Sequence, residues 1–271
     1  MPGRSFAGAR DWVEADLALG TTAYAIVDGD SALVYDTHVS PEHGRSIRRE
    51  LEGRGVRRFS VVLSHWHLDH VAGTAAFADC EVIANERTAS LLAEKGGAIR
   101  AGEELGPPGI DPLILPTRTF SGRESLMVGG TEVELVEFEI HSPDATVLRR
   151  AGDGLLLAGD TLEDTVTFVD EPERLGVHLD ELERLRNLGA NRVLPTHGDP
   201  DLIGSGGYGP GLIDATEDYV RALLRMPGEP ALAEAPLREL IAPALAGGDL
   251  TWNDDYADVH ALNVRAVLGS G

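Results

Sequence analysis

Apolar runs separated by polar turns divide the first third of the chain into short alternating elements. Residues 22–37 predict two strands that meet at an Asp-Gly turn. Residues 40–55 predict a helix, because Ser and Pro open the stretch and glycines close it. The apolar centre of residues 57–64 predicts a buried strand, and residues 80–85 predict another. Strands connected by crossover helices are therefore expected in this region.

The middle of the chain has a different pattern. Residues 96–113 are rich in Gly and Pro, so they predict a surface loop or a partial lid. Between residues 114 and 161, apolar runs broken by glycine predict four or five strands. Residues 170–189 predict a helix in their second half, and residues 191–200 predict a strand with its exit loop.

The last part of the chain is expected to be helical. The glycine-rich stretch 204–211 predicts a flexible loop, and the amphipathic pattern of residues 212–226 predicts a helix. Two more helices are expected before the end. A length of 271 residues suits one large domain or two small ones. We interpret residues 1–271 as a single domain with C-terminal helices from about residue 212.

Charge and cysteine content narrow the classes of function. The formal net charge is −22, so the surface repels nucleic acids and anionic membranes, and neither is an expected partner. Cys80 is the only cysteine, which excludes a disulfide within the chain, and we expect it to be buried and unreactive. The first 20 positions lack the apolar stretch of a secretory peptide, and no membrane-spanning run occurs. These patterns predict a cytoplasmic protein.

The strongest chemical signal is the stretch SHWHLDH at residues 64–70, directly after a predicted buried strand. His65 and His67 are two positions apart, so their imidazoles face the same side of an extended segment. Asp69 and His70 lie at the turn into the next helix and can face a neighbouring point. Imidazole and carboxylate groups both bind zinc and iron, and crowding them together is costly without a partner. The cluster therefore predicts binding of two adjacent metal ions.

This cluster resembles the first metal-binding motif of the metallo-β-lactamase superfamily, a group of metal-dependent hydrolases. Further motifs occur in the order that is typical of the family. His141 follows a predicted strand in VEFEIHSPD, although the family often has Gly-His-Thr at this point. Asp160 ends the apolar run GLLLAGDTL, and His197 precedes a glycine in RVLPTHGDP. The resemblance spans residues 65–198 and extends upstream to ALVYDT, which ends near Asp36.

The resemblance implies a fold and a set of metal ligands. The implied fold is α/β, a four-layer αβ/βα sandwich with two sheets face to face and helices outside. The usual ions in the family are zinc, with iron or manganese in some members, and we expect two Zn²⁺. The ligands implied for the first ion are His65, His67 and His141. The ligands implied for the second ion are Asp69, His70 and His197, with Asp160 bridging both.

The same resemblance implies hydrolysis by a water that two ions activate. Two divalent ions lower the pKa of a shared water towards neutrality and polarise the carbonyl that it attacks. Asp69 would orient this water and pass its proton to the leaving group. The best-known zinc β-lactamases place Cys or another group at the position of Asp160, whereas an aspartate fits lactonases and thioesterases better. A small ester, lactone or thioester is therefore the expected substrate.

Other activities on the same scaffold remain open. A phosphodiesterase or β-lactamase-type hydrolase has a similar site, although the acidic composition and the missing export signal count against nucleic acids and β-lactams. A mononuclear iron oxidoreductase of the persulfide dioxygenase type would need fewer ligands than the seven found here. Metal content discriminates between these activities. A homodimer is a possible assembly, since dimers are common in the family.

Residues outside the ligand set are expected to shape the substrate site. Tyr208 could donate a hydrogen bond to the oxyanion formed in the reaction. The loop 96–113 could cover the site, and Trp252 or Tyr256 could form a wall of the pocket. The remaining histidines are expected to be surface or helix-capping residues: His38, His43, His178 and His260.

Overall fold

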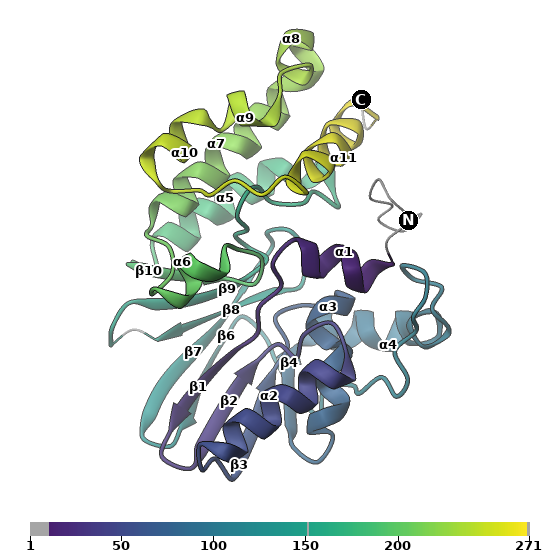
Figure 1. Cartoon of the computed structure of the whole chain (residues 1–271), viewed down its shortest axis with the longest axis vertical. Helices are drawn as coiled ribbons and strands as arrows, with labels where there is room; N and C mark the ends of the chain where they lie inside the picture. Colours follow the sequence, from purple (N-terminus) through teal and green to yellow (C-terminus); the bar gives the residue numbers. More distant parts are fainter. Residues whose placement is uncertain (1–10, 151, 270–271) are drawn as a thin grey trace.

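Two five-stranded β-sheets lie face to face in the computed structural model, and helices cover their outer faces (Figure 1). The structure describes residues 11–150 and 152–269. The layer between the sheets is apolar and includes Leu33, Leu135 and Leu157, all of which are buried. This arrangement confirms the predicted four-layer αβ/βα sandwich.

The first sheet carries the first metal-binding motif. Its strands, in spatial order, are β1 (Tyr24–Asp28), β2 (Ser31–Tyr35), β3 (Arg58–Val62), β4 (Glu81–Asn85) and β5 (Arg118–Phe120). β2 to β5 run parallel, so their carboxyl ends lie at one edge of the sheet. Its outer face is covered by α2 (Pro41–Gly53), α3 (Leu68–Val71), the 3₁₀ helix η1 (Ala72–Phe77) and α4 (Glu86–Ala101).

The second sheet carries the later motifs. Its strands, in spatial order, are β10 (Arg192–Pro195), β9 (Leu155–Gly159), β8 (Ala145–Arg150), β7 (Thr131–Phe138) and β6 (Arg123–Val128). β10 is parallel to β9, and β8 is antiparallel to both β9 and β7. The strands β7, β9 and β10 therefore run in one direction, and their carboxyl ends meet at one edge.

The remaining helices lie before the first strand or pack outside the second sheet. They are α1 (Trp12–Ala18), η2 (Pro172–Arg174), α5 (Leu175–Arg186), α6 (Pro200–Gly204), α7 (Gly211–Arg225), η3 (Met226–Gly228), α8 (Pro230–Ala233), α9 (Leu237–Leu240), α10 (Ala242–Gly247) and α11 (Tyr256–Gly269). The C-terminal helices form a layer of their own, green to yellow in Figure 1. Across residues 11–150 and 152–269, no helix is long and apolar enough to cross a membrane.

The predicted loop 96–113 is shorter in the structure, because α4 continues to Ala101 and ends at Gly102 in a left-handed conformation. Glycine lowers the stability of a helix by only about 1 kcal/mol, and the burial of Ile99 offsets that cost. The rest of the segment packs against the protein, since Trp12 Nε1 donates a hydrogen bond of 2.9 Å to the carbonyl of Pro108.

Candidate metal centre

Several of the predicted ligands directly follow strands, and the fold brings the ends of these strands together. His65 follows β3, His141 follows β7, Asp160 follows β9 and His197 follows β10. The two sheets are joined beside the site, because the Thr146 N–H donates a hydrogen bond of 2.7 Å to the carbonyl of residue 64. Polar side chains from both sheets therefore meet at a single edge of the sandwich.

The seven predicted ligands form two groups of four, and within each group the possible ligand atoms lie within 4.8 Å of one another. The first ligand group is His65, His67, His141 and Asp160. The second ligand group is Asp69, His70, Asp160 and His197. All seven side chains are buried, and only Asp160 belongs to both groups. This grouping agrees with the division that the family resemblance implied.

The shared aspartate lies between imidazoles from several strand ends. Asp160 Oδ2 is 3.2 Å from His70 Nε2, 3.4 Å from His197 Nε2 and 3.5 Å from His141 Nε2. In the second ligand group, Asp69 Oδ2 lies 3.2 Å from His70 Nε2 and 3.1 Å from His197 Nε2. Lone-pair donors thus converge from several sides, as ligands around a cation do.

Buried polar atoms show whether this arrangement fits a metal. Among the residues that the structure describes, the buried atoms of the two groups that make no hydrogen bond include His65 Nε2, Asp69 Oδ2, Asp160 Oδ1 and His197 Nε2. Each unsatisfied buried polar atom costs about 1–3 kcal/mol. Divalent cations would satisfy these atoms, and a set of imidazole and carboxylate donors suits zinc or iron. The residues present therefore fit divalent metal ions.

The pKa shifts of these side chains favour binding of a cation. Burial lowers the pKa of His65 well below its usual range, so the ring stays neutral, which is the form that binds metal. Burial raises the pKa of Asp160, but His70 and His197 lower it by more, and the carboxylate stays ionised. Burial lowers the pKa of His70, yet the carboxylates of Asp160 and Asp69 raise it well above its usual range. A metal cation would compete with a proton for the imidazole of His70.

Comparison with known proteins decides the family. A sequence model of the family described as "Metallo-beta-lactamase superfamily" matches residues 17–197, which include all seven clustered side chains. The chain belongs to the metallo-β-lactamase superfamily. A curated relative, "Beta-lactamase-like protein 2 homolog" from Drosophila melanogaster, is 24% identical over 187 residues. That alignment covers 66% of this chain and 59% of the relative.

Solved structures with the same fold include other members of the superfamily. A metallo-β-lactamase from Pontibacter korlensis has a TM-score of 0.59 at 19% identity, covering 74% of this chain and 87% of that one. The DIM-1 metallo-β-lactamase exposed to ceftazidime has a TM-score of 0.58 at 20% identity, covering 74% and 84%. At such identities the likeness shows the metallo-β-lactamase fold alone.

An aspartate at the end of β2 supports the second ligand group. Asp36 Oδ2 is 2.8 Å from His70 Nδ1, and its Oδ1 accepts a hydrogen bond of 2.7 Å from the Ser64 N–H. The Nδ1–H of His70 is thereby directed to a carboxylate, which leaves Nε2 free to face the group. The sequence pattern places Asp36 near a strand end but does not indicate this role.

A second buried aspartate, Asp144, fixes the backbone around the first ligand group. It accepts hydrogen bonds from the Trp66 N–H at 3.0 Å, from Thr88 Oγ1 at 2.8 Å and from the Ser142 hydroxyl. Trp66 lies between two ligands in sequence, and Ser142 follows His141. Asp144 is absent from the predicted site, although an aspartate three positions after a candidate ligand histidine is an available signal.

Glu163 is the third supporting carboxylate, and it is also absent from the predicted site. Its Oε1 lies 3.2 Å from His141 Nδ1, opposite the ring nitrogen that faces Asp160. The backbone of His141 is in the left-handed region with φ of 66°, an uncommon conformation for a residue other than glycine. The ring is therefore presented from a constrained turn and faces a buried carboxylate on its outer side.

Tyr208 is buried, and its hydroxyl is part of a different network. The hydroxyl donates to Asp164 Oδ2 at 2.8 Å and accepts a hydrogen bond of 2.7 Å from the Asp199 N–H. Its backbone pairs with Val193, which anchors the glycine-rich stretch 204–211 to β10. These bonds give Tyr208 a structural place beside the site, and its role as an oxyanion donor stays a prediction.

Several other expectations need correction. His178 and His260 are buried rather than exposed, and His260 Nδ1 lies 2.9 Å from the Tyr219 hydroxyl. Tyr256 is fully buried, so it cannot form a pocket wall. Cys80 is half-buried rather than fully buried, and burial raises the pKa of its thiol to about 11, which disfavours the reactive thiolate.

Proposed function

We propose that the chain is a metallohydrolase that acts on a small ester, lactone or thioester and uses two divalent ions, most simply Zn²⁺. The observation that carries this proposal is the buried carboxylate of Asp160, which belongs to both ligand groups. A site for one ion would not require a second complete group around the same carboxylate. Two ions held there would supply hydroxide at neutral pH and polarise the carbonyl of the substrate.

The chain's own residues then have distinct tasks. His65, His67 and His141 hold the first position, and Asp160 joins it to the second. Asp69 is the acidic member of the second ligand group that does not bridge, so a carboxylate oxygen of Asp69 accepts the proton of the attacking water. The same oxygen returns the proton to the leaving oxygen or sulfur.

The substrate class is proposed from the ligand chemistry. An aspartate at position 160 supports lactone or thioester hydrolysis over β-lactam hydrolysis. The titles of the solved neighbours name β-lactamases, so a β-lactam belongs among the test substrates. The aligned region is 59% of the curated relative's length, so the activity of that whole protein is no guide to this one.

A substrate panel tests the proposal. Zinc-loaded protein is assayed on a lactone, a thioester, a phosphodiester and a β-lactam, with Asp160→Asn as the matched inactive variant. We expect turnover of the lactone or thioester and two zinc ions per chain. A single iron per chain with oxygen consumption would replace the hydrolase by an oxidoreductase. Activity confined to the β-lactam or the phosphodiester would overturn the substrate class alone.

A further inference from the structure

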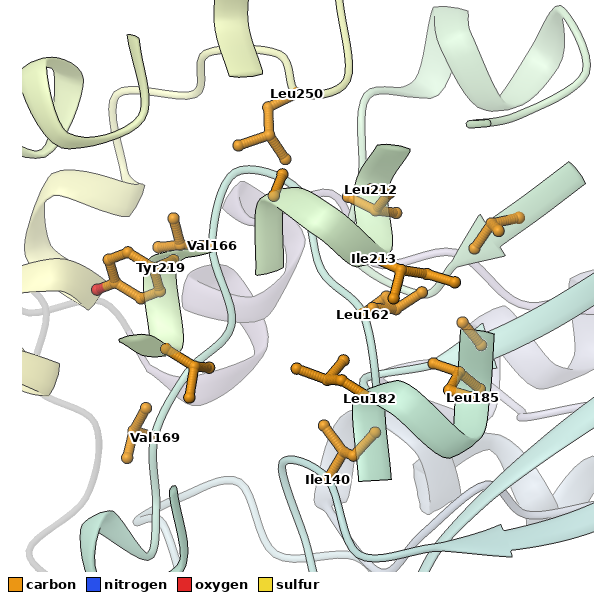
Figure 2. Close-up of a cluster of buried hydrophobic side chains, with 14 of the residues drawn as sticks. Ile140, Leu162, Val166, Val169, Leu182, Leu185, Leu212, Ile213, Tyr219 and Leu250 are labelled. Atoms are coloured by element: carbon orange, nitrogen blue, oxygen red, sulfur yellow. The ribbon is translucent and has the colours of Figure 1, made fainter. Parts of the chain in front are cut away.

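The C-terminal helices pack directly on the segment that follows Asp160. Figure 2 shows Val166 and Val169 of this segment among side chains of the C-terminal layer, which include Tyr219 and Leu250. All of these side chains are buried in one apolar cluster. The helices lie beyond residue 197, where the match to the family model ends. The segment next to the metal centre is therefore covered by a part of the chain outside that match.

Buried hydrogen bonds fix the same segment more closely than apolar packing would. Asn263 in α11 accepts a hydrogen bond of 2.9 Å from the Val169 N–H and donates one of 2.8 Å to the carbonyl of Thr167. At the other end, Asp164 accepts a hydrogen bond of 2.9 Å from the Thr251 N–H. Hydrogen bonds are directional, so the C-terminal region sets the path of residues 164–169 as well as covering them.

Glu163 lies between these hydrogen bonds and the first ligand group. One carboxylate oxygen, Oε1, is 3.2 Å from His141 Nδ1 and accepts a hydrogen bond of 2.9 Å from the Phe168 N–H. The other oxygen, Oε2, accepts a hydrogen bond of 3.3 Å from the hydroxyl of Tyr256. Both Glu163 and Tyr256 are buried, so no bulk water replaces these contacts. The carboxylate is held from the side of α11 and faces the ligand on its other side.

We propose that Tyr256 is a positioning residue for the first ligand group and acts through Glu163 on the imidazole ring of His141. The proposal rests on the metallohydrolase function, because it requires His141 to bind metal. Carboxylates next to ligand histidines orient the ring and increase its basicity, and their loss weakens metal binding about 10–100-fold. The C-terminal helix thereby tunes a centre whose ligands all lie upstream of it.

A purely structural helix would not need this chemistry. Burying a carboxylate and a phenol side by side is unfavourable unless each satisfies the other or a further group. An apolar pair of the same volume would cover the segment equally well. The polar pair instead places a carboxylate oxygen 3.2 Å from His141 Nδ1, the ring nitrogen on the side away from Asp160.

The test compares two buried tyrosines of the same helical layer. Tyr256→Phe removes the hydroxyl that contacts Glu163. Tyr219→Phe is the matched control, because its hydroxyl bonds to His260 and Asn263 instead. Full-length proteins are titrated with zinc in competition with a chelator. The absorption spectrum of the cobalt(II)-loaded proteins reports the ligand geometry, and thermal unfolding of the metal-free proteins reports folding.

We expect Tyr256→Phe to weaken binding of one of the two ions about tenfold and to change the cobalt(II) spectrum. Tyr219→Phe should leave both unchanged at a similar loss of thermal stability. Equal zinc affinities and equal spectra for the two variants would overturn the proposal. If the wild-type protein binds no metal, the proposed function falls as well, so the two failures are distinguishable.

A double variant tests the route through Glu163. Glu163→Gln keeps the shape of the side chain but removes its charge, and we expect about tenfold weaker binding of the same ion. Adding Tyr256→Phe to Glu163→Gln should cause no further loss, because the contact that transmits the effect is already altered. Additive losses would show that Tyr256 acts by another route and would overturn the proposal. This comparison also holds if the single Tyr256 variant folds poorly.

Discussion

The two ligand groups share Asp160 but are supported by different parts of the molecule. The second ligand group is supported by Asp36 at the end of β2, inside the region that matches the superfamily. The first ligand group is supported by Glu163, which contacts α11 beyond that region. The difference teaches that the carboxylate behind His70 has its contacts within the matched region, whereas the carboxylate behind His141 also contacts a helix beyond that region.

Loss of the shared residue should have the largest effect, because it affects both groups at once. We expect Asp160→Asn to lower metal affinity and kcat/KM by more than about a hundredfold, the upper end for a lost supporting partner. Metal content after dialysis and steady-state kinetics measure the two effects. Asp153→Asn, a partly exposed residue that pairs with Arg150, is the control. Retention of one tightly bound ion would show that one ligand group binds metal without Asp160, contrary to what the structure indicates.

Asp144 tests whether the backbone of the first ligand group needs its own support. Asp144→Ala leaves the Trp66 N–H and the Ser142 hydroxyl without their acceptor, and the Thr88 hydroxyl keeps only its bond of 3.1 Å to the carbonyl of residue 144. We expect the free energy of unfolding of the metal-free protein to fall by roughly 3 kcal/mol, measured by urea denaturation. An unchanged unfolding midpoint would mean that the loops around this group are held by other contacts.

Acid should lower the free energy of unfolding through His178, which lies in α5. Burial lowers the pKa of His178 to about 4, so the folded protein takes up this proton less readily than the unfolded chain. Stability is therefore full above the unfolded value of about 6.5 and falls as the pH drops towards 4. At pH 5 the loss from this residue should be about 2 kcal/mol.

The measurement is the unfolding free energy of the wild-type protein and of His178→Gln, each metal-free, at pH 7.5 and pH 5. The variant lacks the titrating group, so its loss between the two pH values should be smaller by that amount. Identical losses would show that His178 does not contribute to acid sensitivity.

Substitution of Asp36 should have the smallest effect, and it tests whether the two ligand groups are supported separately. Asp36→Asn removes the charge next to His70 Nδ1, and we expect one ion to bind about tenfold more weakly. The affected ion should be the one left unchanged by Glu163→Gln, which calorimetric titration of both variants can establish. Asp30→Asn, at a partly exposed ion pair with Arg58, is the control. Weakening of the same ion by both changes would contradict the division into separately supported halves.

The clustering of the candidate ligands and the fold were predictable from the sequence because their signals are local. His65 and His67 stand two positions apart directly after a buried strand, and Asp160 and His197 each end an apolar run. The order of these motifs along the chain supported the family resemblance, and the resemblance implied two sheets face to face. The proposed pairing of ligands into two groups was implied by the family resemblance and agrees with the geometry.

The supporting role of Glu163 was not predictable because its partners are distant in the chain. Glu163 and Tyr256 are separated by 93 positions, and no periodic pattern connects them. The buried position of His178 was missed because a polar residue in an amphipathic helix is expected on its outer face. The extension of α4 was missed because glycine lowers helix propensity, while the tertiary burial of Ile99 is invisible in a local pattern.

A single carboxylate that serves two cations makes their binding interdependent. With two ions bound as proposed, the charge and orientation that Asp160 offers to one ion would change once the other had bound, so the two affinities would not be independent constants. By thermodynamic reciprocity, each ion would change the affinity for its neighbour by the same factor. Zinc availability would then shift this protein between empty and doubly loaded forms with a cooperativity that is set at one side chain.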